Sequence, residues 1–423
     1  MWSVTKNKTL AGCHRWRAPG AANAIVQWRG EGSARWASLQ DSHSVWGSPV
    51  SAASIQGLRT AETTTAIQNW TKTPGHSVIF LTLTLRHRKG QALKTLWDAL
   101  SYCWRGVTGT AAWRGGARSQ GDKVNFGIEH WVRSVEVTHG IHGWHVHIHA
   151  LLLTTRRLGG LELVQLRQRL FGRWSAAAER KGLAAPSDKH GVDLRQAATT
   201  QDAENIASYV AKGVTAESLG AEMSGGLGKI GRRRSSRTPF QILVDIGEAR
   251  HAGQTPAKED VALWHEWEKG SRGRRQMTWS QGAKDTLGIA DLTDEELVEA
   301  GEDQVESWTV AEVAPEQWRK VQSNVEVRLE VVEALAKAST PNEAMRVSHE
   351  VLSRLGIEHT VVMVSDTEVE ERLEDREVTS AGRVWSRMER ERMWREGLRR
   401  KLLRGTEARR SQTRKHEAPL TLF

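Results

Sequence analysis

The chain has 423 residues, enough for two or three domains with substantial buried cores. Its 60 Lys and Arg against 50 Asp and Glu give a formal charge of +10, so we expect a polyanionic partner, with nucleic acid ahead of an acidic membrane surface. Two cysteines exclude a disulfide framework and a CxxC metal site, so a reducing compartment is expected and any metal should be bound by His or carboxylates. The apolar runs are far shorter than the roughly 18 residues of a membrane span, and no signal peptide is evident. We therefore expect a cytoplasmic protein without a membrane partner.

The first regular elements are expected after a variable N-terminal region. Residues 1–74 are rich in Gly, Ala and Ser and show no sustained helical or strand periodicity. From Ser77 the sequence SVIFLTLTLRH alternates apolar residues with threonines, which predicts a half-buried strand. Apolar residues three and four apart predict a helix over 91–104 that lies on the sheet. A Gly- and Arg-rich loop covers 105–123.

Two strands are expected next, over about 126–138 and 143–154. The tight sequence HGIHG between them favours a hairpin with antiparallel strands. Four further segments have the pattern of regular elements: helices over 161–181 and 203–219, a short strand or loop over 191–194, and an apolar segment over 241–246. This order predicts an α+β fold with a central antiparallel β-sheet flanked by helices.

The composition changes again after about residue 250, where we expect a smaller, mainly helical region. Residues 291–318 hold ten acidic residues and no Lys or Arg, and Thr-x-x-Glu sequences at Thr293 and Thr309 predict capping boxes of short helices. Another helix is expected to begin after Thr340 and to end at Gly356. The predicted division is a variable region over 1–74, the central domain over 75–250, a helical or mixed accessory domain over 251–370 and a charged, Arg-rich tail over 371–423.

The strongest indication of a functional site is GWHVHIH at 143–149. Strand side chains two residues apart point to the same face, so the imidazoles of His145, His147 and His149 form a row. Glu136 on the preceding strand can lie beside them. Two imidazoles and one carboxylate suit Mn²⁺ or Mg²⁺ with open positions for a substrate oxygen, whereas three imidazoles suit Zn²⁺. A solvated polar face, with Glu136 as an ordinary surface carboxylate, is the alternative.

A second candidate site lies on the helix expected over 203–219. One face of that helix carries Asn205, Tyr209 and Lys212, whereas Glu204 lies on a different face. A phenol with its usual pKa of about 10 is a poor nucleophile unless a metal-activated phosphate or a nearby cation assists it, and Lys212 could lower that pKa or bind the phosphate. A half-buried Tyr beside a solvated Lys is the simpler interpretation. The His row before this helix and the basic run after it favour a catalytic role for Tyr209 and Lys212.

These segments resemble a known family. FLTLTLRH at 80–87, GWHVHIHALL at 143–152 and YVAK at 209–212 are similar, in order and spacing, to the three motifs of rolling-circle plasmid replication initiators of the HUH endonuclease superfamily. RTPFQILVD at 237–245 resembles the segment after the third motif. The resemblance covers about residues 77–247 and implies an HUH, RRM-like nuclease domain with the His pair on a central strand and a nucleophilic Tyr on a neighbouring helix.

The resemblance implies roles for particular residues. The metal ligands would be His147, His149 and Glu136, with His145 as a further ligand or a DNA contact, and the catalytic pair would be Tyr209 and Lys212. Thr82 and Thr84 match the first motif, whose role is less defined, and are equally consistent with ordinary strand threonines. One departure concerns strand closure, because some single-Tyr relatives place a water-activating Glu four residues before the Tyr, where this chain has Asn205.

The implied activity is transesterification at a plasmid origin with Mg²⁺ or Mn²⁺ as cofactor. Tyr209 would attack a phosphodiester, form a 5′-phosphotyrosine link and free a 3′-hydroxyl that primes synthesis, with rejoining at termination. Origin DNA with a single-stranded or cruciform nick site is the expected partner, and a host helicase and polymerase are expected because no GxxxxGK[ST] phosphate loop is present. Phosphate contacts are expected from Lys229, Arg232, Arg233, Arg234 and Arg237, although a solvated loop is the alternative.

Three other functions remain open at this point. A single-Tyr transposase or a relaxase would use similar chemistry. A metal-dependent DNA-binding regulator could use the same scaffold without cutting DNA. A purely structural zinc module would leave Tyr209 and Lys212 without a role.

Overall fold

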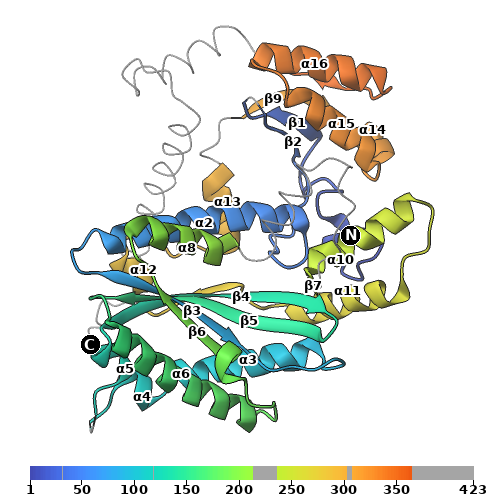
Figure 1. Ribbon diagram of the computed structural model, residues 1–423. Helices are drawn as coiled ribbons and strands as arrows, with labels where there is room; N and C mark the ends of the chain where they lie inside the picture. The colour runs from blue at the N-terminus through green and yellow to red at the C-terminus, as the bar shows by residue number, and fades with distance from the viewer. Residues whose placement is uncertain (31, 118, 213–235, 303–306, 364–423) are drawn as a thin grey trace, which may run out of the picture. The chain divides into compact units, whose positions relative to one another are not determined.

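The computed structural model describes residues 1–423 except 31, 118, 213–235, 303–306 and 364–423 (Figure 1). The described residues form two compact units. The first unit is built from residues 43–298, and the second combines residues 2–42 with residues 299–363. The Arg-rich tail expected over 371–423 lies outside the described residues. No helix in the described part of the chain is both long and apolar enough to cross a membrane.

The first unit contains a central antiparallel sheet with the strand order β6-β3-β5-β4-β7, and β8 pairs with β4. Its strands are β3 Ser77–Thr84, β4 Ile128–Gly140, β5 Gly143–Thr154, β6 Val192–Gln196, β7 Ser236–Arg237 and β8 Met277–Trp279. The predicted central antiparallel sheet and the predicted hairpin of 126–138 with 143–154 are therefore confirmed.

The hairpin of β4 and β5 has a tight turn because Gly143 allows it. Gly143 has a φ of +88°, a left-handed conformation that favours glycine. A Cβ at this position would also lie 3.3 Å from Cα of Lys89, so the close approach of the backbones leaves little room for a side chain. From this turn the register runs with Thr138 opposite His145 and Glu136 opposite His147.

Helices cover both faces of this sheet (Figure 1). On one face lie α2 Pro49–Thr71 and α8 Thr200–Lys212, and on the other lie α3 Leu93–Thr108 and α6 Gly160–Arg180. The predicted helices over 91–104 and 161–181 correspond to α3 and α6. The unit also contains α4 Ala111–Arg114, α5 Asp122–Asn125, α7 Asp188–Gly191, α10 Pro239–His251, α11 Lys258–Ser271 and α12 Ala283–Thr286.

The helix α2 lies within the region that the sequence predicts to be variable. It begins with Ser48, whose side chain accepts a hydrogen bond from the Ser51 amide, and has Pro49 in its first turn. Nine of its thirteen buried positions are Ala or polar residues and only four are large apolar residues, so the helical apolar stripe is weak in the sequence. Ala66, Ile67 and Trp70 nevertheless pack into the core above the sheet.

The second unit has its own four-stranded antiparallel sheet, with the order β10-β9-β1-β2. Its strands are β1 Ala24–Trp28, β2 Ala34–Ala37, β9 Trp308–Val313 and β10 Thr360–Val361. The other helices in the described part of the chain are α1 Lys8–Gly12, α13 Asp294–Glu302, α14 Pro315–Val321, α15 Val325–Leu335 and α16 Pro341–Arg354. In the core of this unit Trp36 from β2 lies 5.0 Å from Trp318 of α14, measured between ring centroids.

This arrangement differs from the predicted domain boundaries. The accessory region is mainly helical, as predicted, but residues near both ends of the described chain also contribute strands to a sheet of the second unit. Residues 251–298 belong to the first unit, where β8 pairs with β4. The capping boxes predicted at Thr293 and the helix after Thr340 are confirmed by side-chain to backbone hydrogen bonds. The box predicted at Thr309 is wrong, because Thr309 lies in β9 and pairs with Gln27.

A buried ion network attaches α2 to the segment around 284–294. The Glu62 side chain is fully buried, and its carboxylate accepts hydrogen bonds of 2.8 Å from both Lys284 and Arg59. Arg59 also pairs with Asp294 at 2.7 Å. Burial lowers the pKa of Arg59, but the charges of Glu62 and Asp294 outweigh burial and raise it above its ordinary value.

Glu62→Gln should therefore lower the free energy of unfolding by about 3 to 5 kcal/mol, because it removes the fully buried countercharge that Arg59 and Lys284 share. Urea denaturation followed by tryptophan fluorescence would measure this change. Glu179→Gln is the control, because Glu179 is exposed near the end of α6, and its effect should stay within about 0.5 kcal/mol. Equal stability of the two variants would contradict the structural role of the network.

Candidate active site

The sheet of the first unit brings Glu136 and two histidines together on one face. Oε2 of Glu136 on β4 lies 2.6 Å from Nε2 of His147 and 2.7 Å from Nε2 of His149 on β5. The register explains this placement, because Glu136 is directly opposite His147 and the side chain of His149 points to the same face. All three side chains are largely buried. One carboxylate oxygen and two imidazole nitrogens thus converge within 4.8 Å of one another.

The electrostatics of this cluster favour a bound cation. Burial raises the pKa of the Glu136 carboxyl, but the hydrogen bonds and charges of His147 and His149 outweigh burial and hold that pKa well below its usual range. Burial also lowers the pKa of His149. Near neutral pH the cluster therefore offers a carboxylate and a neutral imidazole, which are the donor forms that a divalent metal ion requires.

Thr82 on β3 orients His149 from the opposite side. Oγ1 of Thr82 lies 3.2 Å from Nδ1 of His149, and the two residues are directly opposite in the pairing of β3 with β5. A metal bound through Nε2 needs a free lone pair there, so Nδ1 would carry the proton and donate it to Oγ1. Nδ1 of His147 has no hydrogen-bond partner among the described residues. Thr82, a threonine of the first motif, is thus within hydrogen-bond distance of His149, a candidate metal ligand.

His145 lies in the same row but outside the Glu136 cluster. Its ring is 5.0 Å from the rings of both His147 and His87, measured between centroids. Burial, together with the charges of His147 and His87, lowers the pKa of His145 to about 4. Of the two roles expected for His145, the structure places it where it can contact a ligand of the cleft described next rather than beside Glu136.

A cleft of about 680 Å³ opens at the end of the strands beside the His row. Residues from several loops form its walls, among them Arg86, His87, His142, His145 and His190. The cationic and imidazole side chains suit an anionic strand of nucleic acid. His142 and His190 could not be recognised as site residues from the sequence, because they come from the β4–β5 turn and from the short helix α7 and form no pattern of their own.

The helix α8 carries the second candidate site and packs on the same face of the sheet as the His row. Its Ala203, Ala207 and Val210 are buried against Leu151 and Leu153, which alternate in phase with His147 and His149 along β5. Tyr209 and Lys212 belong to the last turns of α8, and their side chains lie outside the described ones. The part of the predicted helix beyond residue 212 also lies outside the described residues.

The position four residues before Tyr209 does not offer a carboxylate. Asn205 is exposed, and its Oδ1 accepts a hydrogen bond of 3.2 Å from Nε2 of Gln201. The helix runs without interruption from Thr200 to Lys212, so no distortion of its start brings Glu204 round to the face of Asn205. The departure from the related single-Tyr initiators therefore persists in the structure.

The structure describes one of the five basic residues expected to bind DNA phosphates. Lys229, Arg232, Arg233 and Arg234 lie outside the described residues. Arg237 pairs with Asp260 at 2.6 Å and with Asp245 at 2.5 Å. Its hydrogen bond to Asp260, opposed by burial and assisted by Asp245, raises the pKa of Arg237 above its ordinary value. Its charge is thus balanced by two carboxylates, an arrangement typical of a structural role.

Comparison with known proteins gives one informative relative. The chain is 30% identical over 314 residues to "Protein rep" of Streptomyces lividans, and the alignment covers 64% of this chain and 68% of that protein. No protein-family model matches the chain. No solved structure matches it either.

Thr82→Val should weaken Mn²⁺ binding to this cluster about tenfold, because loss of an outer hydrogen bond to a ligating His costs 10- to 100-fold in affinity. Thr84→Val is the matched control, because Thr84 lies two residues along β3 on the same face and opposite His147. Calorimetric titration of both variants and the unsubstituted chain would measure the effect. Equal affinities of the two variants would show that the hydrogen bond to His149 does not support metal binding.

Proposed function

The chain belongs to the Rep protein family, and on this basis we propose that it is a plasmid replication initiator that nicks one strand of origin DNA with Tyr209 as its nucleophile. The observation that carries the proposal is the convergence of Glu136, His147 and His149 on the sheet face where α8 packs. A metal-ligand set and a helix with a tyrosine on the same face are the two components that a metal-assisted attack on a phosphodiester requires.

The three ligand residues suit Mg²⁺ or Mn²⁺. Their donors are one carboxylate oxygen and two imidazole nitrogens, without a thiolate that would select a softer ion. When bound, the ion would polarise a phosphoryl oxygen of the scissile phosphate. Glu136 and the two histidines would hold the ion, and the contact of Thr82 with Nδ1 of His149 would keep that ring in the required orientation.

The proposed reaction exchanges one phosphoester bond for another. The phenolate oxygen of Tyr209 forms a bond to phosphorus while the bond to the 3′ oxygen breaks, and the departing oxygen takes up a proton. The products are a 5′-phosphotyrosine link and a 3′-hydroxyl primer, so the energy of the broken bond is conserved for rejoining. Lys212, one helical turn from Tyr209, would lower the pKa of the phenol or bind the phosphate.

The cleft beside the His row provides a place for the strand. Its Arg86 and His87 follow the end of β3, the strand that carries Thr82, and its His145 lies on β5 two residues before the ligand residue His147. A single strand held by its phosphates in this cleft would present a phosphodiester near the cluster. The basic segment at 229–234 would add phosphate contacts, as the sequence predicts.

Tyr209→Phe should abolish the covalent protein–DNA adduct and reduce nicking by about 10⁴-fold or more, as loss of a nucleophile does in other enzymes. The assay uses DNA that flanks the gene, as supercoiled and as single-stranded substrate, with Mn²⁺ or Mg²⁺. Tyr102→Phe is the matched control, because Tyr102 is the chain's other tyrosine, and its ring in α3 lies 4.5 Å from Nζ of Lys181. This variant should form the adduct at the unsubstituted rate.

Two other outcomes would redirect the interpretation. If the unsubstituted chain binds this DNA but neither cuts it nor forms an adduct, the chain acts as a DNA-binding regulator. If an adduct forms but insertion of a DNA segment or transfer of a strand into a recipient exceeds replication, a transposase or relaxase is the better assignment.

The basic segment can be tested by the salt dependence of DNA binding. Replacing Arg232, Arg233 and Arg234 with alanine should reduce the slope of log affinity against log salt by about 2, because each phosphate contact with a single strand contributes about 0.7. Arg237→Gln is the comparison, because its charge is already balanced by Asp245 and Asp260. It should leave the slope unchanged and lower the unfolding temperature instead. A reduction of the slope by about 0.7 in Arg237→Gln would show instead that Arg237 contacts a phosphate.

A further inference from the structure

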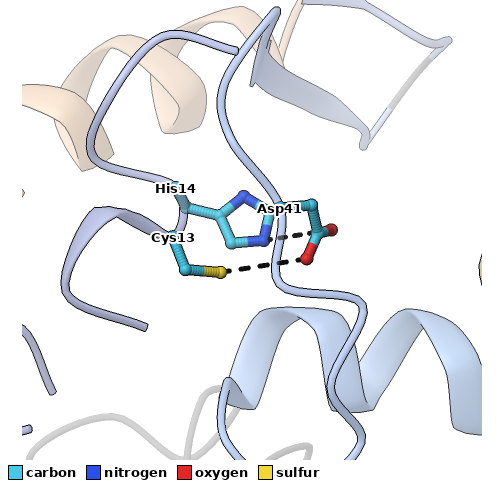
Figure 2. Close-up of side chains that lie close together, drawn as sticks. All are labelled: Cys13, His14 and Asp41. Carbon is cyan, nitrogen blue, oxygen red and sulfur yellow. Dashed lines mark hydrogen bonds and ion pairs between the residues drawn. The ribbon is translucent and has the colours of Figure 1, made fainter. Parts of the chain in front are cut away.

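A second group of metal-ligating side chains lies in the other unit of the chain. Cys13, His14 and Asp41 come together there, as Figure 2 shows, although Asp41 is 27 residues or more from the other two in sequence. Sγ of Cys13 lies 3.8 Å from Oδ1 of Asp41, and Nε2 of His14 lies 3.4 Å from Oδ2 of Asp41. All three donor atoms fall within 4.8 Å of one another.

These separations correspond to the edges of a tetrahedral zinc site. With Zn–S near 2.3 Å and Zn–O and Zn–N near 2.1 Å, tetrahedral angles place sulfur and oxygen ligands about 3.6 Å apart and nitrogen and oxygen ligands about 3.4 Å apart. Sγ of Cys13 is within a few tenths of an ångström of such an edge from Oδ1 of Asp41, and Nε2 of His14 is equally close to one from Oδ2, so the two ligands face different oxygens of the same carboxylate. One ion could therefore contact all three donors after only small movements.

The backbone holds the two ligand-bearing segments side by side. The His14 amide donates to the carbonyl of Gln40, and the Gln40 amide donates to the carbonyl of Trp16. A β-bridge between Arg17 and Leu39 continues this pairing. His14 itself has a φ of 51°, in the left-handed region. The ligand-bearing residues are thus adjacent because of main-chain pairing, independently of any bound ion.

The arrangement does not fit a nucleophilic cysteine. Cys13 is fully buried, so its sulfur is not accessible to a substrate. A buried thiol, imidazole and carboxylate around one point are instead a donor set that zinc accepts.

We propose that Cys13, His14 and Asp41 bind a zinc ion that links the N-terminal segment of the second unit to the segment after β2. Ser42 is the nearest further donor, with its Oγ 3.4 Å from Sγ of Cys13, close to another tetrahedral edge. It can complete the coordination directly or position a water there. The site differs chemically from the Glu136 cluster, which contains no thiolate, so the two sites can be told apart by spectroscopy.

The proposal is tested on the full-length chain by zinc analysis and by replacement with Co²⁺. Thiolate-bound Co²⁺ gives a charge-transfer band in the near ultraviolet, and tetrahedral Co²⁺ gives strong visible bands. We expect about one zinc ion and one such spectrum per chain from this site. Cys13→Ser and the nearly isosteric Asp41→Asn should each lose the tetrahedral spectrum and about one equivalent of zinc, and Cys13→Ser should lose the charge-transfer band.

Cys103→Ser is the matched control, because Cys103 is the chain's other cysteine and is buried in α3 of the first unit. It should keep both the band and the zinc. A double variant, His147→Ala with His149→Ala, should also keep them, so a failure of the Glu136 centre would not be mistaken for a failure of this one. Circular dichroism and unfolding temperature establish that each variant is folded.

Chelation gives a second measurement if Cys13→Ser does not fold. Removal of zinc should lower the unfolding temperature of the unsubstituted chain and of Cys103→Ser, but not that of Asp41→Asn. A chain purified without zinc that takes up no Co²⁺ with a thiolate band would overturn the proposal. Persistence of the charge-transfer band in a folded Cys13→Ser variant would also overturn the proposal. His14 and Asp41 would then form a simple, partly exposed ion pair.

Discussion

The register between β4 and β5 is the constraint on which the candidate active site depends. It places Glu136 directly opposite His147, so one carboxylate oxygen reaches both His147 and His149. A slip by one residue would turn the carboxylate to the other face of the sheet. Buried valines at 135 and 137, the apolar partners Val146 and Ile148, and the tight turn at Gly143 all oppose such a slip. Ordinary core packing therefore sets the geometry of the polar cluster.

The same face of the sheet is divided between an apolar end and a polar end. Toward one end Val78, Val132 and Leu151 are covered by α2 and α8. Toward the other end the strands carry Thr82, Glu136 and the histidines, and the cleft opens there. Because α8 is anchored by apolar side chains next to this boundary, its last turns lie on the face that holds the ligands. Packing thus supplies a helix close to the cluster without burying it.

The elements that the sequence predicts well are those whose information is local. The alternation in β3 to β5, the stripe of α3 and the spacing of the His row are each readable within about a dozen residues, and the structure has each of them. The helix α2 is hard to recognise in the sequence because most of its buried residues are Ala or polar residues, which form no clear apolar stripe. The sheet of the second unit could not be predicted, because β1 and β9 are almost 300 residues apart and only their pairing makes them neighbours. Arg237 shows a related limit, since its role depends on Asp260 from another helix.

The two clusters of possible ligands differ in how easily the sequence reveals them, because one depends on local structure and the other on contacts between distant segments. His147 and His149 share a strand, and Glu136 lies 11 residues before the first of them, so a hairpin alone brings them together. Cys13 and His14 meet Asp41 only because main-chain pairing joins two irregular segments, which no periodicity records. The proposed zinc site would add the Cys13 thiol to the His and carboxylate ligands that the sequence predicts. Thiolate ligands favour zinc over Mg²⁺ and Mn²⁺, so a chain with both sites would use donor chemistry to keep a structural ion at one and a reactive ion at the other.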